Sequence, residues 1–237
     1  MFNTLNMNVV ITGASQGIGK GIAERFAASG ANLFLCSRNM DKSLDWQKEL
    51  TQKYNINIYS FNADLSENEE VENLANAILT KFEKIDILVN NAGSFVPGSV
   101  YNEPEGSLEK MIAINLYSAY HLTRKLLPEM MKEKSGHIFN MCSIAGLQAY
   151  ANGGAYSISK FALNGFTKNL RDEMKPHGIK VTAIHPGAVF TPAWEGFAQP
   201  ERIMEVNDVA EMIFAASRLS LQACVEDIIL RPQLGDL

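Results

Sequence analysis

Short apolar runs alternate along the whole chain with stretches in which apolar residues recur every three or four positions. The short runs are brief and rich in β-branched and aromatic residues, so they predict strands and not buried helices. The longer stretches, such as 18–26 and 71–82, have the spacing of helices with one apolar face. Strands joined by crossover helices form a mainly parallel sheet covered on both faces. The seven predicted strands are 8–12, 32–36, 57–61, 85–89, 137–142, 180–184 and 227–230.

The length of 237 residues suits one α/β domain, and no linker, repeat or low-complexity segment divides the chain. We therefore predict a single doubly wound domain over residues 1–237, with helices on both faces of a seven-stranded, mainly parallel sheet. Ser66 and Glu69 have the spacing of a capping box, which predicts that the helix over 71–82 begins there.

Composition argues against several classes of partner. The net charge is −5 and no block of like charges forms a basic stripe, so we expect no nucleic-acid partner. Cys36, Cys142 and Cys224 are widely spaced and form no CxxC pair, and the four histidines lack metal-ligand spacing. We therefore expect reduced thiols and no metal. No basic region precedes an apolar signal core and no run approaches the ~18 apolar residues of a membrane span, so we expect a cytoplasmic protein.

A glycine-spaced turn follows the first predicted strand. Gly13 is placed for a tight turn, Gly17 for close approach of the backbone to a pyrophosphate, and Gly19 for close packing of the next helix. The N–H groups at the start of that helix would then face an anion. The spacing G-x3-G-x-G differs from the G-x-G-x-x-G of the dinucleotide fingerprint, so the glycines alone also fit a purely structural turn.

The second predicted strand ends at Ser37 and Arg38, 18 and 19 residues after Gly19. Proteins that bind NAD carry an acidic residue here, which bonds the ribose. A serine and an arginine suit the 2′-phosphate of NADP instead, because the guanidinium can bond a phosphate bidentately. The alternative is that Arg38 is an ordinary surface arginine.

Tyr156 and Lys160 are one turn apart on a predicted helix over 151–175, and Ser143 lies thirteen residues upstream. A free phenol has a pKa near 10, and an ammonium group one turn away lowers the cost of its phenolate form. Such a pair can move a proton near neutral pH, although isolated pairs of this kind are often surface contacts. Asn115 interrupts the apolar stripe of the helix that starts near Leu108. A buried amide must be hydrogen-bonded, so Asn115 is either a structural link or part of a polar site.

Six motifs together resemble the short-chain dehydrogenase/reductase superfamily, in its order and at its usual separations, over essentially the whole chain. The resemblance implies a Rossmann-like fold. The motifs are 12–19 (TGASQGIG), 90–93 (NNAG), Asn115, Ser143, Tyr156 with Lys160, and Pro186-Gly187 with Thr191.

The resemblance also implies roles for individual residues. Tyr156 would exchange a proton with the substrate oxygen, and Lys160 would lower its pKa and hold the nicotinamide ribose. Ser143 would orient the carbonyl, and Asn115 would hold a water that relays protons to Lys160. The expected cofactor-binding residues are Gly13, Ser15, Gln16, Gly17, Ile18, Gly19, Ser37, Arg38, Asp64, Leu65, Asn91, Ala92, Gly93, Tyr156, Lys160, Pro186, Gly187, Val189 and Thr191.

We accordingly expect an NADP(H)-dependent oxidoreductase, with NADP(H) favoured over NAD(H), that interconverts a carbonyl and an alcohol. One alternative is a 3-oxoacyl-thioester reductase, which acts on an acyl carrier protein in fatty-acid synthesis. Another is a nucleotide-binding regulator that keeps the fold without turnover, although a pure binder needs no proton donor such as Tyr156. Family members commonly pair through the helices that carry Asn115 and Tyr156, so a homodimer or homotetramer is expected.

A short segment over 192–206 is the expected substrate lid. Its apolar residues Trp194 and Phe197 would line a pocket for a compact, partly apolar carbonyl compound, together with Phe95 and Val96, which follow the motif at 90–93. The alternative for the lid residues is packing against a neighbouring subunit.

Overall fold

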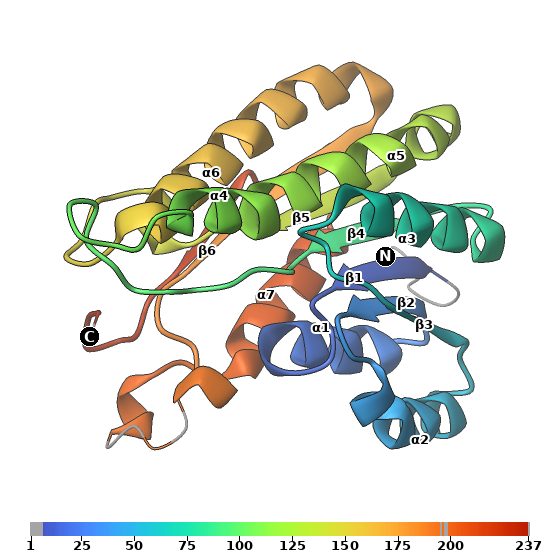
Figure 1. Cartoon of the computed structure of the whole chain (residues 1–237). Helices are drawn as coiled ribbons and strands as arrows, with labels where there is room; N and C mark the ends of the chain where they lie inside the picture. Colours follow the sequence, from blue (N-terminus) through green and yellow to red (C-terminus); the bar gives the residue numbers. More distant parts are fainter. Residues whose placement is uncertain (1–6, 195, 197–198, 237) are drawn as a thin grey trace.

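A parallel sheet of seven strands forms the centre of the molecule, in the order β3-β2-β1-β4-β5-β6-β7 (Figure 1). The computed structural model describes residues 7–194, 196 and 199–236. All six strand pairings are parallel, so the predicted seven-stranded sheet is confirmed. The strands are β1 (Asn8–Thr12), β2 (Asn32–Ser37), β3 (Ile58–Asn62), β4 (Ile87–Asn90), β5 (Gly136–Met141), β6 (Ile179–Pro186) and β7 (Asp227–Leu230).

Helices cover both faces of the sheet (Figure 1). On one face lie α1 (Gly17–Ala27), α2 (Leu44–Tyr54) and α7 (Val206–Ser217). On the other lie α3 (Asn68–Lys81), α4 (Ser107–Ile112), α5 (Ser118–Glu133) and α6 (Gly154–Met174). Side chains alternate between the faces along each strand. Val9 and Ile11 of β1 therefore pack in the core beneath α1 and α7, whereas Val10 packs in the core beneath α3 and α5.

The strand order places a topological switch point between β1 and β4. The chain leaves β1 toward β2 on one side of the sheet and returns to β4 on the other. Ligands of such sheets bind in the crevice outside the carboxyl ends of the strands at this point. The glycine turn follows β1 and residues 91–93 follow β4, so both predicted cofactor segments meet there.

The helix that carries Asn115 is interrupted by a π turn. Helix α4 continues through a π-helical segment at Ala113–Tyr117 into α5. The Ser118 hydroxyl donates to the Ile114 carbonyl at the end of this segment. A π turn inserts an extra residue into the helical repeat and is frequent at functional sites. Here the widened turn carries Asn115.

The predicted capping box at Ser66 and Glu69 is wrong. Helix α3 begins at Asn68, and its N-cap residue Glu67 makes no side-chain capping bond. The Ser66 hydroxyl instead donates to Asp64 Oδ1 at 2.7 Å, because the nearby carboxylate offers a stronger acceptor. The capping box of this fold lies at α7, where Glu205 and Asp208 bond each other's backbone N–H groups.

Within the described part of the chain, no helix is long and apolar enough to span a membrane.

Leu88→Ala should lower the free energy of unfolding by about 2–5 kcal/mol, because it leaves a cavity beside the central strand. Leu88 is fully buried on β4. Urea unfolding followed by far-ultraviolet circular dichroism, at fixed protein concentration, measures the change. Val100→Ala is the control, since its side chain is 71% exposed, and it should change stability by no more than about 0.5 kcal/mol. Equal effects of the two variants would contradict the assigned core.

Candidate active site

The glycine turn after β1 is held in place from β4. The Asn91 amide donates to the carbonyls of Thr12 at 2.9 Å and Gly13 at 3.1 Å. Gly13 has a φ of +65°, and a Cβ at Gly19 would lie 2.2 Å from the Gly13 carbonyl oxygen. Both positions therefore require glycine, and the backbone of the turn stays bare for a ligand. Asn91 supports the turn from behind, as a part of its structure.

A cleft of about 1090 Å³ opens beside this turn. Gly13, Ser15 and Gln16 line one part, and the segment that follows β4 lines another. Of the other predicted cofactor residues, Ser37, Arg38, Asp64, Leu65, Ala92 and Gly93 also line it. The bare glycine backbone and the size of the cleft fit a dinucleotide. Ile18, in contrast, packs its side chain against the core, so only its backbone is available to a ligand.

The far corner of the cleft carries two cations. Arg38 is exposed at the end of β2, and Lys42 lines the same corner from the following turn. The Ser37 hydroxyl accepts a bond from the Asn39 N–H at 3.3 Å, which shapes the loop between the two. No acidic side chain occupies the position after β2. Lys42 was missed by sequence reasoning, because its only signal there is a cation four residues after Arg38.

Asp64 lies on the rim of this cleft, where Ser66 fixes its orientation. Asp64 Oδ1 accepts from both the N–H and the hydroxyl of Ser66. These bonds, and to a smaller extent the charge of Arg38, lower the pKa of Asp64. The neighbouring Leu65 is buried. A carboxylate and an apolar side chain are thus presented together beside the cation corner.

Gly93 joins the cleft to the predicted catalytic residues. A Cβ at Gly93 would lie 2.9 Å from Asn115 Oδ1 and 3.6 Å from Lys160 Nζ. Only glycine leaves room here for both side chains. Lys160 is buried, and its ammonium donates to the Met141 carbonyl at 2.8 Å. The cation therefore lies at the inner end of the cleft.

Asn115 is hydrogen-bonded through both the oxygen and the nitrogen of its side chain. Its Oδ1 accepts from the Ser94 N–H at 2.8 Å, and its amide donates to the Ser94 carbonyl at 3.0 Å. The same amide donates to the Ser159 hydroxyl at 2.9 Å. Asn115 thus links the segment after β4 to the helix that carries Tyr156 and Lys160. Of the two alternatives that its burial allowed, these contacts make it a structural link, in the wall of a polar site.

Tyr156 and Ser143 lie near each other and near Lys160. Ser143 follows β5, and Tyr156 lies in the first turn of α6. The Ser143 side chain lies close enough to the Tyr156 phenol to lower its pKa in part. The ammonium of Lys160 lies 5.7 Å from the centre of the Tyr156 ring. The structure therefore brings all four predicted catalytic residues into one cluster.

Burial dominates the electrostatics of this cluster. It lowers the pKa of Lys160 from 10.5 to about 8. Burial also raises the pKa of Tyr156, and the Ser143 hydrogen bond only partly opposes it. The pKa of Tyr156 is therefore raised overall in this structure, because desolvation of the phenolate is the largest effect on it.

One aromatic ring packs against Tyr156, and a second tyrosine lies within its electrostatic range. The Phe95 ring packs edge-on against the Tyr156 ring at a centroid distance of 4.8 Å, and it remains 54% exposed. Tyr150 lies near enough that Tyr156 contributes, after burial, to raising the pKa of Tyr150 to about 12. Val96 lines the cleft beside Phe95. Sequence analysis missed Tyr150, whose only signal was an aromatic residue shortly before the helix of Tyr156.

The segment after β6 approaches the glycine turn from the other side. Pro186 ends β6, and Gly187 N donates to the Leu230 carbonyl at 2.8 Å. The buried Val189 forms a β-bridge with Met204, and a Cβ at Gly17 would lie 3.2 Å from the Thr191 methyl group. Pro192–Trp194 is a short 3-10 turn in which Trp194 is half-buried. Phe197, the other predicted lid residue, lies outside the described residues.

Among the residues that the structure describes, no three His, Cys, Asp or Glu side chains gather as metal ligands.

Comparisons with known proteins agree on one family. The family model for short chain dehydrogenase matches residues 7–202. An uncharacterized oxidoreductase of Staphylococcus epidermidis is 31% identical over 94% of this chain and 96% of its own. A diacetyl reductase, (S)-acetoin forming, of the same organism is 33% identical over 88% of this chain and 80% of its own. The crystal structure of L-sorbose reductase from Gluconobacter frateurii, complexed with NADPH and L-sorbose, superposes with a TM-score of 0.90 and 25% identity over 98% of both chains.

The depressed pKa of Lys160 makes a prediction about stability. A lysine whose pKa falls on folding weakens the folded state below that pKa, and the penalty fades as the pH rises. Between pH of about 7 and about 9.5 the folded chain releases this proton while the unfolded chain retains it. The free energy of unfolding of the wild type should then rise by about 2 kcal/mol relative to Lys160→Met. Urea titrations at several pH values measure the difference, and parallel curves for the two proteins would contradict the prediction.

Proposed function

The chain belongs to the short-chain dehydrogenase family, and we propose that it is an NADP(H)-dependent oxidoreductase that reduces a carbonyl group to an alcohol, or catalyses the reverse. The observation that carries this proposal is the cluster of Ser143, Tyr156, Lys160 and Asn115 at the inner end of a glycine-lined cleft. A protein that only bound the nucleotide would have no use for a phenol and a buried ammonium at that position.

The residues of the cleft fit NADP(H). The glycine turn would hold the pyrophosphate on backbone N–H groups, and Arg38 with Lys42 would bind the 2′-phosphate. Asp64 and Leu65 would border the adenine, and residues 186–191 would close over the other end. When bound, the cofactor supplies or accepts the hydride, and the protein supplies orientation and charge.

Each of the predicted catalytic residues would have a separate role at the substrate. The Ser143 hydroxyl would hydrogen-bond the substrate oxygen and orient the carbonyl. Tyr156 would donate the proton to that oxygen in reduction and remove it in oxidation. Lys160, fixed by the Met141 carbonyl, would stabilise the phenolate left by this transfer and hold the ribose hydroxyls. Asn115 Oδ1 has one acceptor site beyond its bond to Ser94, and there it would hold the water that returns a proton toward Lys160.

The substrate pocket favours a compact, partly apolar carbonyl compound. Phe95 and Tyr150 flank the proton donor, so an apolar group beside the carbonyl would contact aromatic surface. This environment supports a small diketone of the kind named by the diacetyl reductase relative, and it gives little hydrogen bonding to a sugar. Trp194 of the lid would close the pocket opposite Phe95.

The decisive experiment is oxidation of NADPH measured against diacetyl, aldehydes, sugars, pterins and 3-oxoacyl thioesters. We expect the highest kcat/KM with diacetyl or another small carbonyl compound. Highest activity with the acyl thioesters would favour an acyl-carrier reductase. Tight NADPH binding without turnover of any compound would favour a nucleotide-binding regulator and would overturn the proposal.

Tyr156→Phe should lower kcat by roughly 10²-fold or more, the scale of general acid catalysis, because no proton donor remains beside Ser143. The dissociation constant for NADPH, measured by its fluorescence, should stay unchanged. Tyr101→Phe is the matched control, since the Tyr101 side chain is 87% exposed. Near-normal turnover of Tyr156→Phe would remove this residue from the mechanism.

The cation corner predicts cofactor preference. Charge-assisted phosphate bonds from Arg38 should make NADPH bind about tenfold to a hundredfold more tightly than NADH. The double variant Ser37→Asp with Arg38→Ala should reverse the order, because a carboxylate would replace the phosphate contact. Lys42→Ala should weaken NADPH binding and leave NADH binding unchanged. Equal affinity of the wild type for both cofactors would show that Arg38 and Lys42 are ordinary surface charges.

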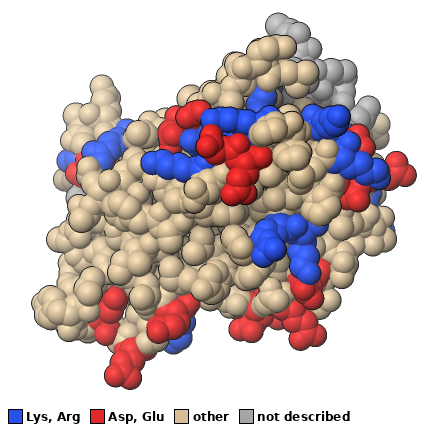
Figure 2. Space-filling model, turned by 90° about the horizontal axis from the view of Figure 1, so that it is seen from above, with Lys and Arg blue, Asp and Glu red and all other residues tan. Residues whose placement is uncertain are grey.

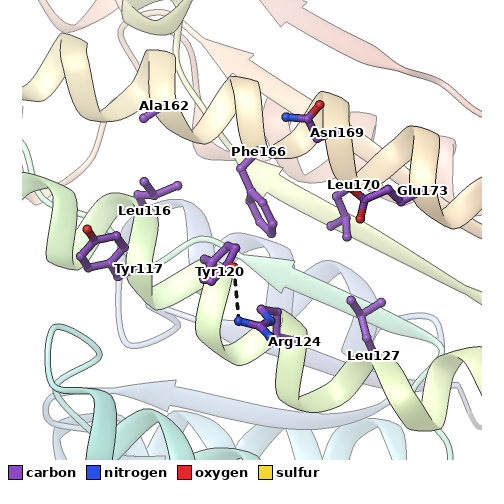
Figure 3. A pocket seen from close by; sticks show the side chains of 10 residues that line it. All are labelled: Leu116, Tyr117, Tyr120, Arg124, Leu127, Ala162, Phe166, Asn169, Leu170 and Glu173. Atoms are coloured by element: carbon purple, nitrogen blue, oxygen red, sulfur yellow. Dashed lines mark hydrogen bonds between the residues drawn. The ribbon is translucent and has the colours of Figure 1, made fainter.

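We further propose that two copies of the chain pair through α5 and α6. Seen from above, this side of the molecule has a broad area of uncharged residues, with groups of Lys, Arg, Asp and Glu beside it (Figure 2). A hollow of about 620 Å³ lies between the two helices, and Phe166 of α6 points toward Tyr120 of α5 within it (Figure 3). Arg124 and Glu173 lie at its edge. In a two-fold pair each arginine would face the glutamate of the other copy, so the surface is self-complementary.

Ala162→Arg should shift the protein toward the monomer, because a long cation in the hollow would obstruct the partner's helices. Arginine is a good helix former, so α6 itself should persist. Sedimentation velocity measures the oligomeric state. Glu49→Arg on the exposed side of α2 is the control and should leave it unchanged. An unchanged oligomer in Ala162→Arg would exclude this face as the interface.

A further inference from the structure

A buried histidine lies directly behind the catalytic serine. His185 is near the end of β6 and its side chain is 0% exposed. Its Nδ1 lies 3.2 Å from the Ser143 carbonyl oxygen, and its Nε2 lies 2.9 Å from Asp227 Oδ1 on β7. The ring therefore bridges the outer strand of the sheet and the segment that presents the Ser143 hydroxyl.

Both atoms that face the ring accept hydrogen bonds. A carbonyl oxygen has no proton to donate, and an ionised carboxylate has none either. A neutral imidazole carries one N–H, so it would satisfy one of the two contacts and direct a lone pair at an oxygen in the other. The doubly protonated imidazolium satisfies both.

Charged side chains of both signs surround the His185 ring. Asp227 directs Oδ1 to His185, and its Oδ2 lies 3.6 Å from Arg171 Nη1 of α6. Arg171 also pairs with Glu226 at 3.6 Å and donates to the Val181 carbonyl. On the catalytic side, the thiol of Cys142 lies within the fields of Lys160, Asp227 and Arg171. Asp227 is thus the anion that lies against both the ring and the Arg171 guanidinium.

The Ser143 carbonyl also receives a bond from Gly146 N at 3.0 Å. The Ser143 hydroxyl accepts from Ala145 N at 3.1 Å. The bond from His185 therefore fills the second acceptor position of that carbonyl and fixes the peptide plane from behind the strand. Loss of this bond would leave the peptide held only by the short turn at residues 144–146.

We propose that His185 is a positioning residue, hydrogen-bonded through both ring nitrogens to Asp227 and to the Ser143 carbonyl, that fixes the Ser143 peptide so that the serine hydroxyl stays aimed at Tyr156. This role rests on the proposed orientation of the substrate carbonyl by Ser143. It gives a function to a buried histidine and its partly exposed aspartate partner, neither of which the proposed reaction otherwise uses.

The protonation state can be measured without turnover. The chain has four histidines, so ¹⁵N-detected ring spectra of the full-length protein can be assigned with single variants. At pH 7 the wild type should show both His185 ring nitrogens protonated, and Asp227→Asn should convert the ring to a neutral form. A bare ring nitrogen in the wild type, or an unchanged ring in Asp227→Asn, would overturn the proposal. Because this readout needs no substrate, it separates failure of the proposal from failure of the proposed reaction.

Kinetics with diacetyl as the carbonyl probe tests the consequence for catalysis. His185→Asn keeps a donor near the Nδ1 position, whereas His185→Phe keeps the volume and loses both bonds. We expect His185→Phe to lower kcat about tenfold, the scale of one charge-assisted hydrogen bond, with the KM for NADPH unchanged. His185→Asn should retain more of the wild-type kcat than His185→Phe. His177→Asn, at the opposite end of α6 from Tyr156, is the control, and equal kcat in it and His185→Phe would contradict the positioning role.

Discussion

The structure depends on the hydrogen bonds that hold the ends of β1 and β4 together at the point where the sheet splits. Asn91 donates through its side chain to the carbonyls of Thr12 and Gly13, and the N–H groups of Asn91 and Ala92 donate to the Thr12 hydroxyl. These bonds satisfy carbonyls that the diverging strands cannot pair. They also leave the outer side of the glycine turn free for a ligand. The cleft therefore depends on the Asn91 and Ala92 bonds, which hold the turn from its inner side.

A chain of polar side chains continues from this point into the catalytic cluster. The Asn90 amide donates to Thr123 of α5 and to Asn140 of β5, and Asn140 donates to Thr167 of α6. These groups are buried, and burial of an amide is tolerable only when it is hydrogen-bonded. The two helices that carry Asn115 and Tyr156 are therefore tied to the central strands by directional bonds as well as by apolar packing. Such bonds fix helix position more narrowly than packing alone.

Burial of the proposed catalytic cluster lowers the stability of the fold, but it suits the proposed proton transfer. Lys160 is buried with its ammonium near a backbone carbonyl, and burial lowers its pKa toward the physiological range. Burial raises the pKa of Tyr156 at the same time. A phenol that keeps its proton and an ammonium that can lose one suit proton donation to a carbonyl oxygen near neutral pH. The sheet behind them, which is fully buried at Val89 and Phe139, offsets the cost of this desolvation.

The sequence by itself determined the strands, the parallel sheet and the family, because these follow from local periodicity and from motifs at fixed spacing. It also singled out Ser143, Tyr156 and Lys160 as candidates for proton transfer, because their residue types suit that chemistry. Only the tertiary structure brought Lys42 into the cleft, seated Tyr150 beside Tyr156, and set His185 between Ser143 and Asp227. It also overturned the expected capping box at Ser66, since a carboxylate competed for the serine, and it raised the pKa of Tyr156 through burial. These features share one physical reason. Hydrogen-bond partners and desolvation depend on residues that are far apart in the chain, so they cannot be predicted from a local sequence pattern.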